Sequence, residues 1–218
     1  MYLSLMTRCK ALYITVWSTS WLLLVYSGLS EPALAQTSSY TEAKLIQRAE
    51  QSIREIKTLK ANFLQISSDG SVGEGILYFR RPSQLRLEYK KPETLALVTS
   101  RVWLYVDDKV AKTVQAIPLS QTPLSLLLSQ KVSFRSGDFK TSAAEQHGIA
   151  VISIVKQDGD AAGHLDLEFD TDSWQLRRWQ ITDTFGVKTS VTLQNPVYGQ
   201  ALPNRLFRVP SYDQNTDN

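Results

Sequence analysis

Cysteine is almost absent from this chain. Its 218 residues contain a single cysteine, Cys9, near the N-terminus. One thiol cannot build a disulfide framework or a cysteine-based metal site, and Cys9 lies in a segment that we expect to be removed. We therefore expect no disulfides, no thiolate nucleophile and no N-terminal cysteine that could carry a lipid after processing.

Histidine and the common catalytic motifs are equally scarce. The only histidines are His147 and His164, and neither has further ligands at the spacing of a metal site. The sequence has no Gly-x-Ser-x-Gly elbow, phosphate-binding loop or dinucleotide fingerprint. Asp166, Glu168 and Asp170 alternate with apolar residues, which places them in solvent rather than in an apolar cleft suited to acid–base catalysis. We predict a protein without enzymatic activity, metal or organic cofactor.

An excess of one charge is also lacking. Lys and Arg number 24, Asp and Glu number 21, and the net charge is +3 without a long block of like charges. So small an excess does not favour nucleic acid as a partner or general adsorption to membranes. Composition alone indicates a soluble globular domain.

The N-terminus has the features of an export signal. Arg8 and Lys10 precede an apolar stretch at residues 11–25, and the small residues 33–35 form a signal peptidase site. A transmembrane anchor is the alternative, but the stretch is shorter than the about 20 residues that span a bilayer. We predict cleavage after Ala35.

This prediction divides the chain into a signal peptide, residues 1–35, and residues 36–218. The second part has the length of one domain that can bury a substantial core or enclose a cavity. An exported bacterial protein with this signal and no anchor is expected in the periplasm.

Two segments have the pattern of helices. Residues 42–57 repeat apolar side chains at helical spacing, with polar side chains on the opposite face. The apolar stripe consists of Leu45, Ile46, Ala49, Ile53 and Ile56. Residues 122–128 begin with Thr-Pro and continue into a leucine-rich run, which indicates a short helix that is buried or faces a cavity.

Strands dominate the remainder. Alternating apolar and polar residues, separated by turn residues, predict roughly ten short strands. They lie near residues 59–63, 75–80, 84–89, 95–98, 102–106, 111–116, 148–155, 164–169, 176–182, 187–193 and 206–209, with a tight turn at Asp107-Asp108. The pattern indicates a mainly β (α+β) fold, an incomplete antiparallel β-barrel of about ten to eleven strands. The N-terminal amphipathic helix and the short internal leucine-rich helix would cover it as a lid.

Residues 75–89 are the most informative segment. Leu77, Phe79 and Arg81 share one strand face, so an apolar row ends in a cation just before Pro82. Proline cannot donate to a strand ladder and belongs at a strand end. An arginine placed there can reach over the mouth of a barrel with its five donors. This arrangement favours a container for an apolar ligand.

In their order and spacing, these features resemble the LolA family of periplasmic lipoprotein carriers. The amphipathic helix is followed by the strand 59–65, then by Arg81-Pro82, the Trp-containing strand 102–105 and the Thr-Pro helix 122–127. The resemblance covers nearly the whole chain after residue 35.

The resemblance implies a half-barrel with a lid and a role in lipoprotein transport. Members receive acylated lipoproteins from an ABC-type releasing complex of the inner membrane and deliver them to an outer-membrane acceptor such as LolB. The arginine before the proline, here Arg81 with Pro82, is implied to be the lid latch. It would hold the lid closed through hydrogen bonds to main-chain carbonyls and release it when acyl chains enter.

Strand faces and this resemblance together predict which residues contact acyl chains. They are Phe63, Leu77, Phe79, Leu85, Leu87, Tyr89, Trp103, Leu126 and Leu127. The predicted lid-helix residues are Leu45, Ile46, Ala49 and Ile53. The plainer interpretation of the aromatic residues is an ordinary core. We expect the protein to act as a monomer.

Three alternatives remain open. A carrier of another amphiphile, such as a glycolipid or hopanoid, would have the same sequence features. A lipoprotein sensor of the RseB type is expected to carry an additional C-terminal domain, whereas this chain ends soon after Phe207. A secreted hydrolase would need a cluster of polar residues inside the cavity, and the sequence offers none.

Overall fold

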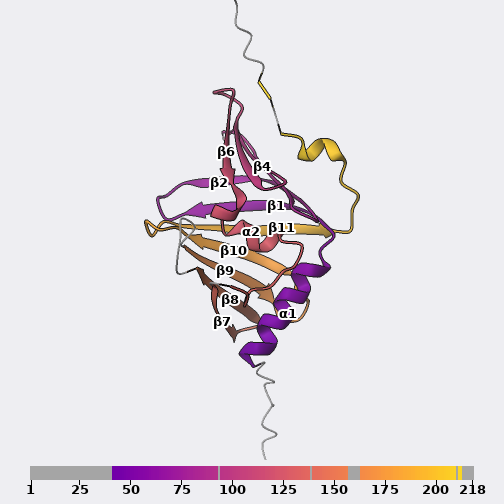
Figure 1. Cartoon of the computed structure of the whole chain (residues 1–218), viewed down its shortest axis with the longest axis vertical. Coiled ribbons are helices and arrows are strands. Elements are labelled where there is room, and N and C mark those ends of the chain that lie inside the picture. The colour runs from indigo at the N-terminus through magenta and orange to yellow at the C-terminus, as the bar shows by residue number, and fades with distance from the viewer. Residues whose placement is uncertain (1–40, 93, 138, 157–162, 210, 213–218) are drawn as a thin grey trace, which may run out of the picture. The chain divides into compact units, whose positions relative to one another are not determined.

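The computed structural model describes residues 41–92, 94–137, 139–156, 163–209 and 211–212 (Figure 1). The predicted signal peptide and its cleavage site after Ala35 lie outside these residues. No helix among the described residues is long and apolar enough to cross a membrane.

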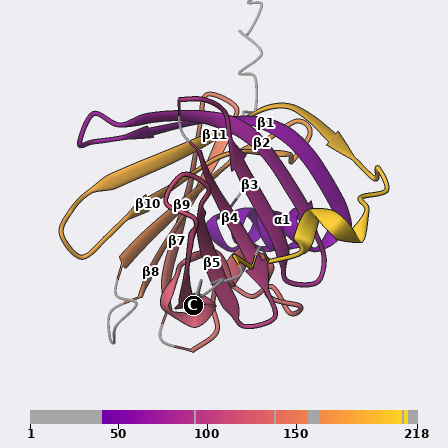
Figure 2. The same ribbon diagram turned by 90° about the horizontal axis from the view of Figure 1, so that it is seen from above.

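Eleven strands within the described residues form one antiparallel sheet. They are β1 (Thr58–Ser67), β2 (Val72–Arg80), β3 (Gln84–Tyr89), β4 (Leu95–Ser100), β5 (Trp103–Asp108), β6 (Thr113–Pro118), β7 (Phe139–Gln146), β8 (Ile149–Lys156), β9 (Gly163–Asp170), β10 (Leu176–Thr182) and β11 (Lys188–Tyr198). The order is β6-β5-β4-β3-β2-β1-β11-β10-β9-β8-β7, with β6 and β7 as the two edges. The sheet curls around the first helix without closing (Figure 2). The predicted incomplete barrel is confirmed.

Two α-helices lie where the sequence predicts them. Helix α1 (Glu42–Glu55) buries its apolar stripe and contacts β7 and β8. Helix α2 (Leu124–Leu128) follows a short 3-10 helix, η1 (Leu119–Gln121), and buries three of its leucines. In Figure 1 both helices lie over the same side of the sheet.

Strand β7 was missed by the sequence analysis. It is an edge strand that pairs only with β8, and every second residue along it is exposed. Its Lys, Ser, Ala, Glu and Gln residues have weak strand propensities. Pairing with the apolar strand β8 therefore determines its conformation more than its own sequence does.

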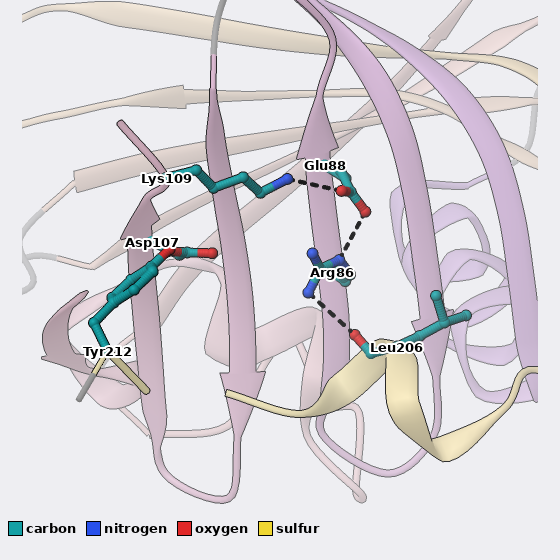
Figure 3. Close-up of polar contacts among 6 residues, drawn as sticks. All are labelled: Arg86, Glu88, Asp107, Lys109, Leu206 and Tyr212. Carbon is teal, nitrogen blue, oxygen red and sulfur yellow. Dashed lines mark hydrogen bonds and ion pairs between the residues drawn. The ribbon is translucent and has the colours of Figure 1, made fainter. Parts of the chain in front are cut away.

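The tight turn predicted at Asp107-Asp108 was wrong, because both residues belong to β5. Asp108 accepts hydrogen bonds from the main-chain nitrogens of Val110 and Ala111, both at 2.9 Å, and so closes the turn from its edge. The Asp107 carboxylate is buried on the outer face of the sheet, where the Tyr212 hydroxyl donates to it at 2.6 Å (Figure 3).

The strand predicted at residues 206–209 was also wrong. The chain forms a 3-10 helix, η2 (Asn204–Phe207), in a segment that we call the C-terminal strap (residues 200–209). The strap contacts β3 and β4, and Phe207 is buried. The carbonyl of Leu206 accepts from Arg86 at 3.4 Å instead of joining a ladder (Figure 3). Tertiary contacts with the outer face of the sheet therefore replace strand pairing.

A small network of charges surrounds this contact. Glu88 accepts from Lys109 at 2.8 Å and from Arg86 at 3.0 Å (Figure 3). Burial raises the pKa of the Glu88 carboxyl, but the hydrogen bonds from Lys109 and Arg86 outweigh burial and hold this pKa below its usual value.

Candidate functional site

The inner face of the sheet and the two helices enclose an apolar cavity. Its walls come from α1, α2 and the strands β1, β2, β3, β10 and β11. The lining residues are Ile53, Ile56, Leu59, Leu77, Phe79, Leu85, Leu124, Leu127, Leu128, Leu176, Trp179 and Leu193. Across the described part of the chain, no group of three or more His, Cys, Asp or Glu could hold a metal ion. The cavity can hold apolar groups by burial.

Strand register explains how one wall forms. Leu77 and Phe79 alternate along β2, and Leu85 of β3 stands opposite Phe79. On the other side of β2, Leu59 of β1 also stands opposite Phe79. Opposite residues on neighbouring strands share a face, so these side chains form an apolar row that faces the helices.

The cavity is nearly filled. Its volume, the space open to the centre of a water-sized sphere, is about 30 Å³, whereas a cavity of about 150 Å³ accommodates a molecule of the size of benzene. A long acyl chain is larger still, so it can enter only if part of the wall moves. The strands are joined by continuous main-chain ladders and the helices are not. We therefore regard α1 and α2 as the movable part and call them the lid.

Arg81 connects the sheet to both helices of the lid. It follows β2, and its peptide bond to Pro82 is cis. Its Nε donates to the carbonyl of Ile53 in the last turn of α1 at 3.1 Å. Its Nη2 and Nη1 donate to the carbonyls of Leu127 and Ser129 at the end of α2, at 2.8 and 2.6 Å. The last carbonyls of a helix lack intrahelical partners, so one forked guanidinium satisfies acceptors from both helices.

The guanidinium group of Arg81 is partly buried, so its charge needs these hydrogen-bond partners. Burial, and after it the charge of Arg54, lowers the pKa of Arg81 from its usual value. An arginine nevertheless stays protonated in proteins, so the cost of removing its charge from water must be offset by partners. The three carbonyls offset it, and the Phe79 ring lies 5.5 Å from the guanidinium carbon. The closed lid is thus the state in which Arg81 is satisfied.

A second connection joins α1 to the segment after α2. Arg54 donates to the carbonyl of Val132 at 2.9 Å, and Glu50 accepts from the main-chain nitrogen of Phe134 at 2.7 Å. The Phe134 side chain is fully buried. These bonds join the segment to α1, so we expect the two to move together. The sequence pattern does not indicate this connection, because Glu50 and Arg54 lie on the polar face of the helix, which is typical of a solvated surface.

The structure places part of the predicted contact set on the cavity wall. Leu77, Phe79, Leu85 and Leu127 line the cavity, and so does Ile53 among the predicted lid-helix residues. The other predicted lid-helix residues are buried in the core without lining it; they are Leu45, Ile46 and Ala49.

Phe63, Leu87 and Tyr89 belong to the core beside the cavity rather than to its wall. The Phe63 ring lies against Gly75, where a Cβ atom would come within 2.6 Å of the ring. The Tyr89 ring meets Phe63 edge-on at a centroid distance of 5.1 Å, and its hydroxyl contacts Gln65 at 2.6 Å. These rings fill one end of the barrel interior.

Trp103 and Leu126 do not lie on the cavity wall. The Trp103 side chain is 40% exposed, whereas its neighbour Leu104 is buried in the core. The alternation of β5 was therefore assigned to the wrong face. Leu126 points to a separate shallow pocket that it shares with Phe139 and Ile154.

The remaining wall residues were not among the predicted contacts. Leu176, Trp179 and Leu193 come from β10 and β11, far along the chain from β2. The pairing of β1 with β11 brings these strands beside the first half of the sheet. The apolar alternation of β10 and β11 was the available signal, but it did not show which strands meet.

Comparison with known proteins identifies related sequences. A sequence model of the family described as "Outer membrane lipoprotein carrier protein LolA" matches residues 54–210. The outer-membrane lipoprotein carrier protein of Azotobacter vinelandii is 28% identical over 189 residues, which cover 82% of this chain and 90% of that protein. The protein of the same name from Methylococcus capsulatus is 26% identical over 161 residues, covering 70% of this chain and 76% of that protein.

Among solved structures, a LolA superfamily protein from Nitrosomonas europaea aligns with a TM-score of 0.46 and 9% identity, over 78% of this chain and 98% of that chain. The family match extends over most of the described sheet, from the last turn of α1 through the C-terminal strap. This chain therefore belongs to the LolA family of outer membrane lipoprotein carrier proteins.

Proposed function

We propose that this protein carries lipoproteins across the periplasm with their acyl chains sheltered in the apolar cavity. It would receive them from an ABC-type releasing complex of the inner membrane and pass them to an acceptor at the outer membrane. The observation that carries the proposal is the position of Arg81, which ties both helices of the lid over a cavity lined only by apolar side chains.

Physical chemistry explains why such a carrier needs a latch. Exposing an acyl chain to water costs about 0.8 kcal/mol per CH₂, so long chains need shelter. A shelter without an opposing cost would never unload. Three carbonyls satisfy Arg81 only while the lid is closed, so acyl binding must give up these bonds. The cost lowers the net affinity and keeps the cargo transferable.

The proposed roles follow the position of each residue. Arg81 is the lid latch, and Pro82 supports it by ending the strand without a donor. The acyl chains would displace the lid from the cavity wall and contact Leu77, Phe79 and Leu85 first. Phe63, Leu87 and Tyr89 would be reached when the chains extend into the neighbouring core.

The cellular location is part of the proposal. The basic residues, the apolar stretch at 11–25 and the small residues at 33–35 support export with removal of residues 1–35. Transport of this kind involves no covalent step, and we propose that the protein acts as a monomeric chaperone.

The decisive experiment compares two forms of one lipoprotein. Purified residues 36–218 are mixed, without detergent, with the acylated form and with its deacylated form, and each mixture is analysed by size-exclusion chromatography. We expect a soluble one-to-one complex with the acylated form alone. Aggregation of the lipoprotein without complex formation would refute the proposal. In that case, lipid extraction from the natively expressed protein would show whether a glycolipid, a hopanoid or another amphiphile occupies the cavity.

A further inference from the structure

A groove lined by both polar and apolar side chains lies beside the apolar cavity. It encloses about 330 Å³ between the end of α1 and the start of β10. Its lining residues are Ser52, Glu55, Ile56, Ser173, Trp174, Gln175 and Tyr198. Ile56 lines both the groove and the cavity, and Leu176, next to Gln175, lines the cavity. The two spaces thus adjoin at Ile56.

The register of β11 places Tyr198 at this boundary. Tyr198 stands opposite Leu59 of β1, and Leu59 is part of the cavity wall. Opposite residues share a face of the sheet, so the Tyr198 ring lies on the inner face with Leu59. Its aromatic ring packs against the apolar core. Its hydroxyl is therefore at the point where the apolar wall ends.

Tyr198 differs from the other hydroxyl residues of the groove. The Ser52 hydroxyl donates to the carbonyl of Trp174, and the Ser173 hydroxyl contacts Asp170 at 3.0 Å. The Tyr198 hydroxyl is buried, and no group of the described residues forms a hydrogen bond with it. A buried hydroxyl without a partner is unfavourable to the folded protein and calls for an explanation. Burial also raises the pKa of Tyr198, so the hydroxyl keeps its proton and remains a donor.

We propose that this groove is a second subsite, which takes the polar linkage of an acylated cysteine. The Tyr198 hydroxyl would donate to a carbonyl oxygen of the glyceryl esters or of the first peptide bond, while the acyl chains occupy the adjoining cavity. The inference rests on the proposed carrier function, because it assigns a place to the head of the same cargo. It explains why a groove with polar side chains adjoins the cavity at the end of α1, a helix of the lid.

The chemistry of the ligand sets the design of the test. The Tyr198→Phe variant removes one hydroxyl and leaves the ring that packs against the core. Two probes are titrated: diphenylhexatriene, an apolar fluorophore without hydrogen-bonding groups, and a synthetic dipalmitoylated cysteine peptide that competes with it. The matched control is Tyr78→Phe, because Tyr78 lies on the outer face of β2, opposite Lys60 of β1.

For Tyr198→Phe we expect affinity for the lipopeptide to fall about fivefold, the effect of one lost hydrogen bond, with unchanged affinity for diphenylhexatriene. The variant should be at least as resistant to urea as the wild type, because the lost hydroxyl has no partner in the protein. The Tyr78→Phe control should bind both probes like the wild type.

Two failures can be told apart. If the wild type binds both probes and Tyr198→Phe binds the lipopeptide equally well, or loses affinity for both probes alike, the subsite is refuted and the carrier function stands. If the wild type binds neither probe, the carrier function itself fails, and the subsite fails with it.

Discussion

Replacing Arg81 by leucine should leave a protein that loads cargo but releases it poorly. The substitution removes three hydrogen bonds from a charged donor to the carbonyls of the lid. Such bonds contribute about 1.5–3 kcal/mol each, and we take about 1 kcal/mol each because Arg81 is only half-buried and the carbonyls can bind water instead. The closed lid then loses about 3 kcal/mol, roughly a hundredfold in the ratio of closed to open protein.

This loss acts on release more than on uptake. A lid that opens more easily still admits acyl chains. When the chains leave, however, the closing lid no longer forms hydrogen bonds to Arg81, so release is less favourable. Release should slow by up to about a hundredfold. The assay loads the purified variant with acylated lipoprotein, adds liposomes that carry the outer-membrane acceptor, and follows transfer with time. Arg81→Lys should give an intermediate rate, because lysine keeps the charge but lacks the planar fork.

Arg80 provides the matched control. Its side chain lies on the outer face of the sheet, donates to the carbonyl of Leu202 at 2.8 Å and stacks over the Phe207 ring. Arg80→Leu should therefore weaken the C-terminal strap and leave the transfer rate unchanged. Transfer at the wild-type rate by Arg81→Leu, or equal slowing by both variants, would contradict a latch role for Arg81.

Three further perturbations test the lid, the cavity and the sheet. Glu50→Gln weakens the hydrogen bond that Glu50 accepts from Phe134, so urea denaturation should show a free energy of unfolding lower by about 1–2 kcal/mol. Uptake of a fluorescent fatty acid should be faster, and unchanged uptake would show that this bond does not restrain the lid. Leu77→Ala enlarges the cavity and should lower the free energy of unfolding by about 2–5 kcal/mol. Diphenylhexatriene should bind this variant more tightly, and weaker binding would show that the probe does not bind in the cavity. The Glu88 carboxyl has a lowered pKa in the folded protein, so its stabilising contribution is complete above the unfolded-state value of about 4.3 and is lost as the pH falls through the lower folded value. The free energy of unfolding of Glu88→Gln should therefore decrease less steeply than that of the wild type as the pH is lowered. An identical dependence on pH in the two proteins would contradict this.

The sequence was sufficient for most of the fold and for the position of Arg81, because both depend on local patterns. The role of Arg81 as lid latch was implied by the resemblance to the LolA family and stays a proposal. Strict alternation of polar and apolar residues in β3 indicates a sheet with one apolar face, and Pro82 marks where the preceding strand has ended. The position of Arg81, as the cation that ends an apolar row, follows from the same local pattern. The stripe of α1 is equally local, since four buried residues at helical spacing define one face.

The rest depends on contacts between distant segments. Trp103 and Leu104 alternate as any strand would, and only the curvature of the sheet decides which of them faces inward. Similarly, the sequence pattern indicates that Glu50 is a surface residue, and only the tertiary structure shows its hydrogen bond with the main chain of Phe134. The wall contributed by β10 and β11 required the pairing of β1 with β11, which no local pattern shows.

The distribution of hydrogen bonds explains why the lid should move while the sheet stays intact. Neighbouring strands are joined by main-chain ladders, so opening the sheet would leave many main-chain donors and acceptors unsatisfied. Side chains from the segment that follows β2 hold the lid. Arg81 makes most of these contacts, and Ser83 adds a longer one to the carbonyl of Leu128 at 3.4 Å. Acyl chains can replace the apolar contacts that the lid gives up on opening. They cannot replace the carbonyls that satisfy Arg81, and under the proposed carrier function this residual cost in the loaded state would favour delivery.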